Sequence, residues 1–288
     1  DYYSQHSSIL KSEIPGKTRK ELTELPQSFE EDLKYCKENK KIPLILLSTG
    51  SYCPVHKKHI LIFSLVKEEL EKYNFKVLAS YISPSHDKYL KSKAKRYGFE
   101  NHLINFEDRC KLIKESIASL KRDLIIDTWE GKQSKFIDFP DVWVSMQYFF
   151  EQTVKEKGYP ELEIKVAYIV GDDMLKTGID NHHHALSLEE NTYRLPLVVI
   201  GRVENSNNFL DKKIEIYAKM SEEEKVERGL FYIKTEDEES LSSTKFRDLF
   251  IKGAKDEELL KIVEKPVLDY FKEQFTKEKT SGFLLSFK

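Results

Sequence analysis

The feature that most constrains the fold of this sequence is an apolar run, a glycine turn and a helical pattern that follow one another over residues 41–70. The run at residues 42–47 is almost entirely apolar, which is typical of a strand buried on both faces of a sheet. After Gly50, apolar residues recur at near-helical spacing from Ile60 to Leu70. Open α/β sheets bind ligands where a strand passes through such a turn into a helix. The sequence therefore predicts an α/β fold with a ligand site at this turn.

His56 and His59 stand at the start of the helical pattern. A helix N-terminus offers unpaired backbone N–H groups and about half a positive charge, so it attracts anions. Histidines three residues apart share one helix face, and both rings can donate to the same phosphate oxygens. Such a pair alone is more typical of a solvated turn. The strand and the glycine turn before it favour a phosphate site.

A second anion site is indicated near the other end of the chain, at residues 241–247. Ser243 and Thr244 precede a helical pattern, where hydroxyl residues usually serve only as caps. Arg247 follows within the same helix, and a guanidinium beside free N–H groups can clamp a polyphosphate in two places. Two anion sites in one α/β domain suggest one long anion.

The whole chain alternates between strand and helix patterns, which predicts an open, mostly parallel sheet with helices on both faces. Strands are expected at residues 42–48, 76–83, 124–129, 163–170, 195–201 and 230–234. Helices are expected at residues 57–72, 106–120, 142–157, 243–253 and 266–275. We expect these elements to form one catalytic domain over residues 41–276, followed by a tail at residues 277–288.

Residues 1–40 are polar, with Pro15 and Pro26 as breakers and one helix expected from Phe29 to Glu38. We expect this N-terminal extension to lie on the surface of the domain. It is a candidate surface for a second copy of the chain or for a partner protein.

The charge balance and the cysteine content narrow the choice of binding partner and of cellular compartment. The 47 basic and 49 acidic residues nearly balance, so a general polyanion partner such as nucleic acid is not expected. We expect no membrane partner, because no apolar run approaches the roughly 20 residues that span a bilayer. The 3 cysteines are odd in number and unspaced, which favours a reducing intracellular compartment, cytoplasmic or nuclear.

Five motifs occur in an order and approximate spacing that resembles the nicotinamide mononucleotide adenylyltransferases, particularly the eukaryotic type. They lie at residues 50–59, 82–91, 127–130, 171–175 and 242–247, and the resemblance covers about residues 41–275. It implies a Rossmann-like nucleotidyltransferase fold, with ATP and a pyridine mononucleotide as substrates. It also implies transfer of the adenylyl group of ATP to nicotinamide or nicotinic acid mononucleotide, with release of pyrophosphate. Magnesium would arrive with ATP, and no dedicated metal ligands are expected in the chain.

The resemblance also assigns roles residue by residue. His56 and His59 would bind and orient the ATP phosphates, and Lys91, in a basic loop at residues 88–96, would reach the phosphate under attack. The remaining nucleotide contacts would come from Gly50, Ser51 and Tyr52 at the first turn, Gly171 and Asp173 near the ribose, and Ser243, Thr244 and Arg247 at the β- and γ-phosphates.

The sequence departs from the family pattern around the base. Cys53 stands where the family usually has asparagine, and Asp172 adds a carboxylate beside the expected ribose contact. The tryptophan that stacks on the pyridine ring in the family is missing, and His184 lies at about the right distance to replace it. The other wall of the base pocket would come from Trp129, Phe136, Phe139 or Trp143.

Two alternative functions stay open. One is a catalytically degenerate member of the family with a structural or interaction role, because the base pocket has changed. The other is a nucleotidyltransferase with a different phosphate acceptor, since cytidylyl and pantetheine-phosphate transferases share the phosphate motifs and differ in the acceptor pocket.

Overall fold

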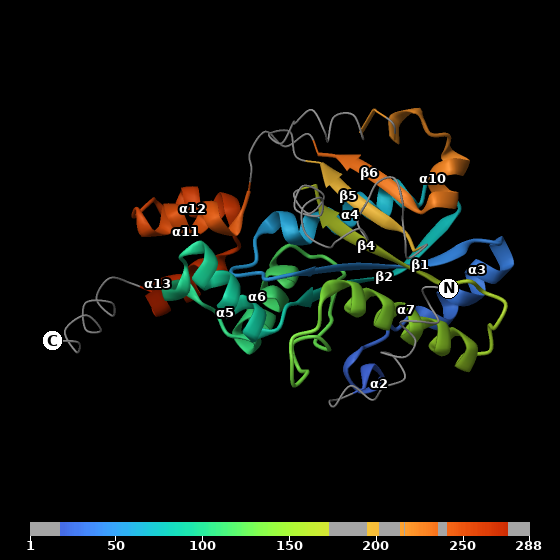
Figure 1. Ribbon diagram of the computed structural model, residues 1–288, viewed down its shortest axis with the longest axis horizontal. Helices are drawn as coiled ribbons and strands as arrows, with labels where there is room; N and C mark the ends of the chain where they lie inside the picture. Colours follow the sequence, from blue (N-terminus) through green and yellow to red (C-terminus); the bar gives the residue numbers. More distant parts are fainter. Residues whose placement is uncertain (1–17, 173–194, 202–213, 216, 236–240, 276–288) are drawn as a thin grey trace.

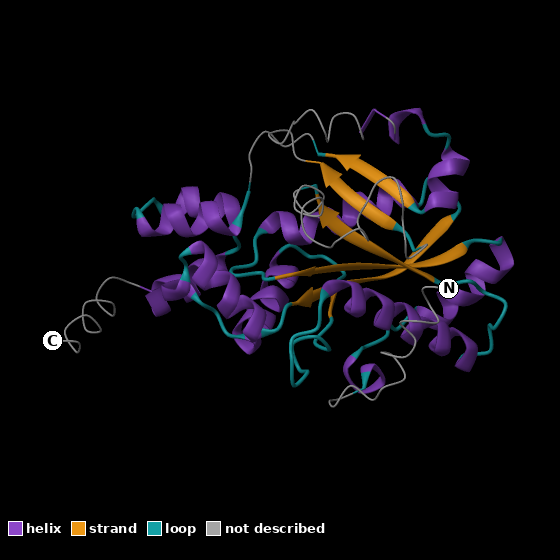
Figure 2. Cartoon of the chain, viewed as in Figure 1, coloured by secondary structure: helices purple, strands orange, loops and turns teal. Residues whose placement is uncertain are grey.

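The computed structural model describes residues 18–172, 195–201, 214–215, 217–235 and 241–275 (Figure 1). A parallel sheet of six strands, in the order β3-β2-β1-β4-β5-β6, lies at its centre (Figure 2). The strands are β1 (Ile42–Gly50), β2 (Phe75–Pro84), β3 (Ile125–Ile126), β4 (Lys165–Gly171), β5 (Leu197–Gly201) and β6 (Leu230–Lys234). The chain moves outward from β1 to β3 and then returns to β4, so the order reverses between β1 and β4.

Helices cover both faces of this sheet. They are α2 (Arg19–Leu22), α3 (Phe29–Asn39), α4 (Lys57–Leu70), α5 (Asp87–Tyr97), α6 (Phe106–Ser119), α7 (Phe139–Glu156), α10 (Glu222–Arg228), α11 (Ser243–Ile251), α12 (Asp256–Ile262) and α13 (Lys265–Phe275), with a 3₁₀ turn η1 (Glu100–His102). Leu44 and Leu46 of β1 pack with α4, α6 and α11–α13 on one face, whereas Ile45 and Leu47 pack with α3 and α7 on the other. This alternation follows from the two-residue period of a strand.

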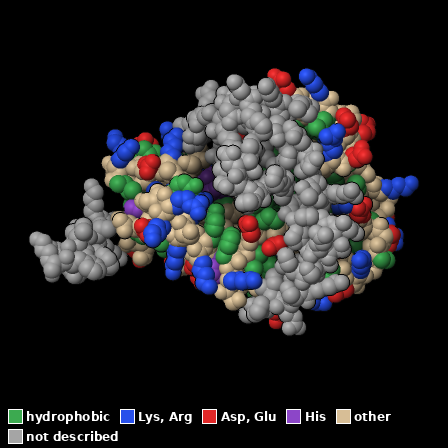
Figure 3. Space-filling model, in the orientation of Figure 1, with side chains coloured by type: hydrophobic (Ala, Val, Ile, Leu, Met, Phe, Trp, Pro, Cys, Tyr) green, Lys and Arg blue, Asp and Glu red, His purple; other side chains and the backbone are tan. Residues whose placement is uncertain are grey.

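The expected α/β fold with an open parallel sheet is confirmed, and each expected strand overlaps an observed one. The basic loop expected at residues 88–96 is wrong, because these residues form most of α5. Leu90 and Ala94 are buried four residues apart on one face, His86 caps the start, and Gly98 ends the helix at φ 70. Lys88, Lys91 and Lys95 are exposed, whereas Lys93 is half-buried. In Figure 3 basic side chains gather over this part of the molecule.

The N-terminal segment contributes to the core. Phe29, Leu33 and Cys36 of α3 are each at most 2% exposed, and Arg19 of α2 is 6% exposed. Within residues 18–40, the expectation of a segment that only covers the surface is therefore wrong. The domain boundary at residue 40 stays a prediction, and the tail at residues 277–288 lies outside the described residues. Across the described ranges, no helix combines the length and the apolar character needed to cross a bilayer.

Candidate active site

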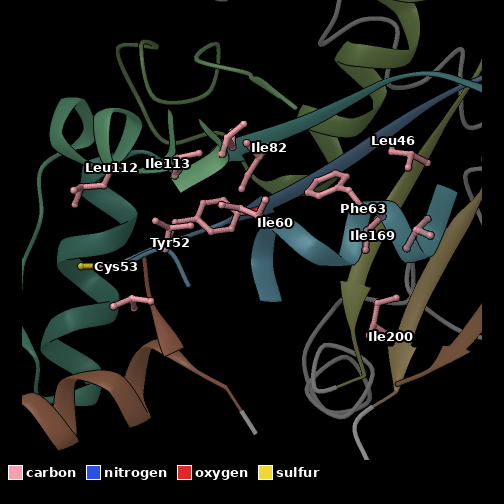
Figure 4. Close-up of a cluster of buried hydrophobic side chains, with 14 of the residues drawn as sticks. Leu46, Tyr52, Cys53, Ile60, Phe63, Ile82, Leu112, Ile113, Ile169 and Ile200 are labelled. Atoms are coloured by element: carbon pink, nitrogen blue, oxygen red, sulfur yellow. The ribbon is translucent and has the colours of Figure 1, made fainter. Parts of the chain in front are cut away.

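The turn after β1 is held together by its own tyrosine. Tyr52 has a φ of 44°, in the left-handed region, and its hydroxyl donates to the Ser48 carbonyl at 3.1 Å. Its ring therefore folds back over Gly50, where an added Cβ would meet the ring at 3.0 Å. Tyr52 and Cys53 also belong to the apolar cluster beneath the turn (Figure 4). A side chain at position 50 would therefore require the Tyr52 ring to shift by a few tenths of an ångström.

The two histidines stack at the start of α4. Their ring centroids are 3.4 Å apart, and the ring of Tyr52 meets His59 edge-on at 4.8 Å. His56 is the N-cap residue, and its backbone N–H donates to Nδ1 of His59 at 3.1 Å. Because Nδ1 accepts this bond, the neutral His59 ring carries its proton on Nε2. The local structure thus prepares His59 as a hydrogen-bond donor through Nε2.

A pocket lies beside these histidines, and we call it the phosphate pocket. It is lined by Ser48, His56, Lys58, His59, Ile62, Ile169, Val170, Gly171, Ile200 and Leu241. The lining comes from the carboxyl ends of β1, β4 and β5, from the first turns of α4, and from the residue just before the cap of α11. The pocket therefore occupies the place where the strand order reverses, which is the usual ligand site of doubly wound sheets.

The start of α11 is fastened to the turn before α4. Ser243 Oγ donates to the Pro54 carbonyl at 2.8 Å, although the two residues are 189 positions apart. Arg247 is 7% exposed, with its guanidinium 4.1 Å from the centroid of the Phe99 ring. Its two terminal nitrogens donate to the Cys53 carbonyl and to Thr244 Oγ1. The two phosphate motifs of the sequence are thus adjacent in space.

A buried arginine ties the turn after β1 to the loop after β2. Arg109 of α6 is 0% exposed and donates to the Ser51 carbonyl at 2.8 Å and to the Ser85 carbonyl at 2.6 Å. It also pairs with Asp87 at 2.8 Å, at the first residue of α5. Sequence reasoning missed Arg109. The available signal was a charged residue at an apolar position of an amphipathic helix.

Glu130 is a buried carboxyl at the same edge of the sheet, in the turn that follows β3. It is 2% exposed, and Oε1 accepts the backbone N–H of His86 at 3.1 Å. Burial raises the pKa of Glu130 to about 8, helped by the nearby charge of Asp127, while Arg109 and Arg19 oppose the rise. A group that titrates near neutral pH in such a place is a candidate functional residue. In the sequence, Glu130 is marked only by its place in the motif at residues 127–130.

The aromatic candidates for base stacking are differently placed. Trp129 is 4% exposed and has the Arg19 guanidinium 4.3 Å from its ring centroid. Phe139 stacks on Tyr168, and Trp143 is 0% exposed. Phe136, in contrast, is 37% exposed and stacks on Tyr89 at 5.0 Å. Their roles toward a base stay predictions, and His184 and Asp173 lie outside the described residues.

Lys91 is exposed on α5 and is not among the residues that line the phosphate pocket. The same pocket gathers His56, His59 and Gly171, whereas Thr244 and Arg247 line a second pocket. Ser243 bonds Pro54 and Arg247 bonds Cys53, so the start of α11 is fastened to the turn before α4. Among the residues with described positions, no three His, Cys, Asp or Glu side chains are grouped to hold a metal ion. Magnesium bound to ATP stays a prediction.

Comparison with known proteins gives the class of this protein. The cytidylyltransferase-like family model matches residues 47–249, which is more than half of the chain. The chain therefore belongs to the cytidylyltransferase-like family. More particularly, it is a distant homologue of the eukaryotic nicotinamide/nicotinic acid mononucleotide adenylyltransferases, which confirms the resemblance found in the motifs.

Individual relatives match only in part. The Arabidopsis thaliana nicotinamide/nicotinic acid mononucleotide adenylyltransferase is 29% identical over 135 residues, which are 47% of this chain and 51% of that protein. The Oryza sativa protein of the same name is 34% identical over 92 residues, which are 32% of this chain and 33% of that protein. The chain thus spans about half or less of the length of these curated relatives.

A solved structure shares the fold. The Plasmodium falciparum nicotinic acid mononucleotide adenylyltransferase complexed with NaAD superposes with a TM-score of 0.50 at 16% identity, covering 80% of this chain and 95% of that one.

Proposed function

We propose that this protein transfers the adenylyl group of ATP to nicotinamide or nicotinic acid mononucleotide and releases pyrophosphate. The coarser function, nucleotidyl transfer, is supported by the family. The observation that carries the proposal is the contact of Ser243 with Pro54, which joins the starts of α4 and α11 beside the stacked histidines. We expect one triphosphate to contact both helix starts, because each offers free backbone N–H groups to an anion.

The geometry supports a division of the site into two halves. The phosphate half consists of the phosphate pocket and the start of α11, and it would hold the triphosphate of magnesium-bound ATP. The acceptor half consists of the loops at residues 83–87 and 127–133, at the carboxyl ends of β2 and β3. A mononucleotide bound there would approach the α-phosphorus from the side opposite to the departing pyrophosphate.

The reaction needs no protein nucleophile, because the attacking phosphate is already an anion. An oxygen of the mononucleotide phosphate forms a bond to the α-phosphorus, and the bond from the α-phosphorus to the bridging oxygen breaks. Pyrophosphate leaves with the electron pair. Catalysis then consists of positioning and charge stabilisation. His59, donating through Nε2, and the backbone N–H groups of α4 would stabilise the charge that grows on the leaving phosphate.

The aromatic residues that could contact the base of the acceptor differ from those that the sequence suggested. Because Trp129 is buried under Arg19, a pyridine ring would instead meet the exposed Tyr89–Phe136 stack, whose rings are 13° from parallel. Tyr89 follows His86 by three residues on α5, and Phe136 follows Glu130 by six residues in the loop after β3. His86 and Glu130 are themselves joined by a hydrogen bond. This assignment supports a planar aromatic base as part of the acceptor.

The test is pyrophosphate release from the purified chain with ATP, magnesium and each mononucleotide in turn. We expect release with at least one of them, and strong loss of release in a His59→Ala variant. Lys67→Ala, exposed on the same helix, is the matched control and should behave as wild type. Release only with a different acceptor, such as phosphopantetheine, would contradict the proposed substrate. Absence of ATP binding in calorimetry would contradict catalysis altogether.

A further inference from the structure

Arg19 is a buried charge that the family match does not include, since that match begins at residue 47. It is the first residue of α2 and is 6% exposed. Its Nη1 lies 3.1 Å from both carboxylate oxygens of Asp127, and its Nε donates to Ser145 Oγ at 2.7 Å. Nη2 donates to the Val142 carbonyl at 2.9 Å. The guanidinium is therefore bound on several sides within the domain.

Asp127, which pairs with Arg19, bonds both β2 and the turn after β3 in the acceptor half. It is 0% exposed and accepts hydrogen bonds from Ser83 Oγ at 3.1 Å and from the backbone N–H of Trp129 at 3.3 Å. Its own backbone N–H donates to the Ile82 carbonyl, which continues the pairing of β2 with β3. Asp127 thus fixes the end of β2 relative to the turn that follows β3.

The 127–130 turn connects Asp127 to the loop at residues 83–87. The Arg19 guanidinium covers the ring of Trp129, and Glu130 follows directly with its bond to the His86 backbone. A continuous set of contacts therefore runs from Arg19 through Asp127 and the 127–130 turn to the start of α5.

A buried ion pair is weak evidence for a stabilising role, because well-packed apolar residues often replace such a pair without loss. What the arginine supplies is geometry, because its planar guanidinium is held through three nitrogens. Nη1 bonds both oxygens of Asp127, while Nε and Nη2 bond Ser145 and the Val142 carbonyl. The guanidinium also compensates the charge of Asp127. An uncompensated carboxylate in the acceptor half would repel a phosphate-bearing substrate.

We propose that Arg19 is a positioning residue for the acceptor half, acting through Asp127 on the 127–130 turn. The segment before the family-matched region is then part of the functional site. The partner chemistry is a mononucleotide that carries a phosphate and a planar base. The inference rests on the proposed function, because that function defines which half of the site holds the acceptor.

The experiment compares Arg19→Met with Arg19→Lys, and uses Lys20→Met as the matched control. Lys20 is the next residue of α2 and makes only an exposed ion pair with Glu156. For each variant, KM and kcat are measured separately for ATP and for the mononucleotide, and calorimetry gives the affinity for each alone. Circular dichroism establishes that each variant is folded.

We expect Arg19→Met to raise the mononucleotide KM about tenfold or more, with the ATP KM within about twofold of wild type. Arg19→Lys should restore this KM in part, because it keeps the charge beside Asp127 but loses the bonds to Ser145 and Val142. Lys20→Met should match wild type. If Arg19→Met fails to fold, the double variant Arg19→Met/Asp127→Asn removes both charges, and it should fold while keeping the raised mononucleotide KM.

Three results with the Arg19→Met variant would overturn the inference. Equal changes for both substrates would show a general structural role, and a lowered mononucleotide KM would show that Arg19 obstructs the site. Unchanged constants in a folded variant would show no role at all. If the wild type binds mononucleotide without turnover and Arg19→Met loses that binding, the inference holds while the proposed function fails. A wild type that binds no mononucleotide would overturn both.

Discussion

The phosphate half and the acceptor half of the site are built in different ways. The centre of the phosphate half is local, because a glycine turn, an N-cap and two stacked histidines lie within residues 50–59, while β4, β5 and the start of α11 complete it. The acceptor half depends on buried groups that are distant in sequence. Arg19 of α2 binds Asp127 in the loop after β3, which also contains Glu130, and Arg109 of α6 binds the loop after β2. A short motif can therefore specify phosphate binding, whereas acceptor binding requires the whole fold to be in place.

The largest expected effect tests the dependence of the acceptor half on buried charge. Arg109→Met removes the bonds to Ser51, Ser85 and Asp87. We expect the free energy of unfolding to fall by about 3 kcal/mol, because polar partners lose a buried cation. Urea unfolding measures this. Lys114→Met, exposed on the same helix, should change stability by less than about 0.5 kcal/mol. If Arg109→Met also changed the free energy of unfolding by less than about 0.5 kcal/mol, the acceptor half would not depend on this buried cation.

The next effect concerns catalysis in the phosphate half. His59→Ala should lower kcat about 10²-fold, which is typical when one preorganised donor to the transition state is lost. The donor is the Nε2 proton, whose position follows from the His56 N–H bond to Nδ1. Steady-state pyrophosphate release measures the loss. Near-normal turnover in the folded variant would show that the stacked histidines serve only the helix start.

A pH-dependent effect follows from Glu130. Its folded pKa of about 8 lies above the ordinary glutamate value of 4.5, so between these pH values the folded state binds a proton that the unfolded state releases. Stability from this group is complete below about pH 4.5 and is lost as the pH rises toward 8. Glu130→Gln keeps an oxygen for the His86 N–H and removes the titration.

We therefore expect Glu130→Gln to gain stability relative to wild type as the pH rises from 5 to 8, by on the order of 1 kcal/mol. Thermal unfolding at several pH values measures the difference. Glu107→Gln, at an exposed position, serves as the control and should track wild type. A constant difference between Glu130→Gln and wild type at all pH values would mean that Glu130 is ionised throughout.

The smallest effect tests the junction of the two phosphate motifs. Ser243→Ala removes the hydrogen bond to the Pro54 carbonyl, which is worth about 1 kcal/mol. The ATP KM should rise by about threefold to tenfold, with the mononucleotide KM unchanged. Ser242→Ala, which removes only the cap bond to Lys245, separates the junction from helix capping. If the two variants behave alike, the junction has no role of its own.

Much of the fold could be predicted because its signals are local. The expected strand at residues 42–48 matches β1, and the expected helix at residues 57–72 matches α4, since period and glycine turn act over a few residues. α5 was missed because its lysines outnumber the buried Leu90 and Ala94. The gathering of His56, His59 and Gly171 at one pocket was also accessible, because parallel strands end at one edge.

The rest of the site could not be predicted from sequence alone. The burial of Arg19 depends on Asp127, which is 108 residues away, and no local pattern encodes such a partner. Trp129 illustrates the same limit. Its motif suggested a stacking surface for a base, but a side chain from α2 covers the ring.

β1 is shared by both core layers, and this arrangement affects the hydrogen exchange of its backbone. Because β1 contributes Leu44 and Leu46 to one core and Ile45 and Leu47 to the other, neither layer can open without disturbing the same backbone. Amide protons of β1 should therefore exchange with deuterium only through global unfolding. A nucleotide held at the end of this strand would slow that exchange on both sides of the sheet by the same factor, set by its concentration and dissociation constant.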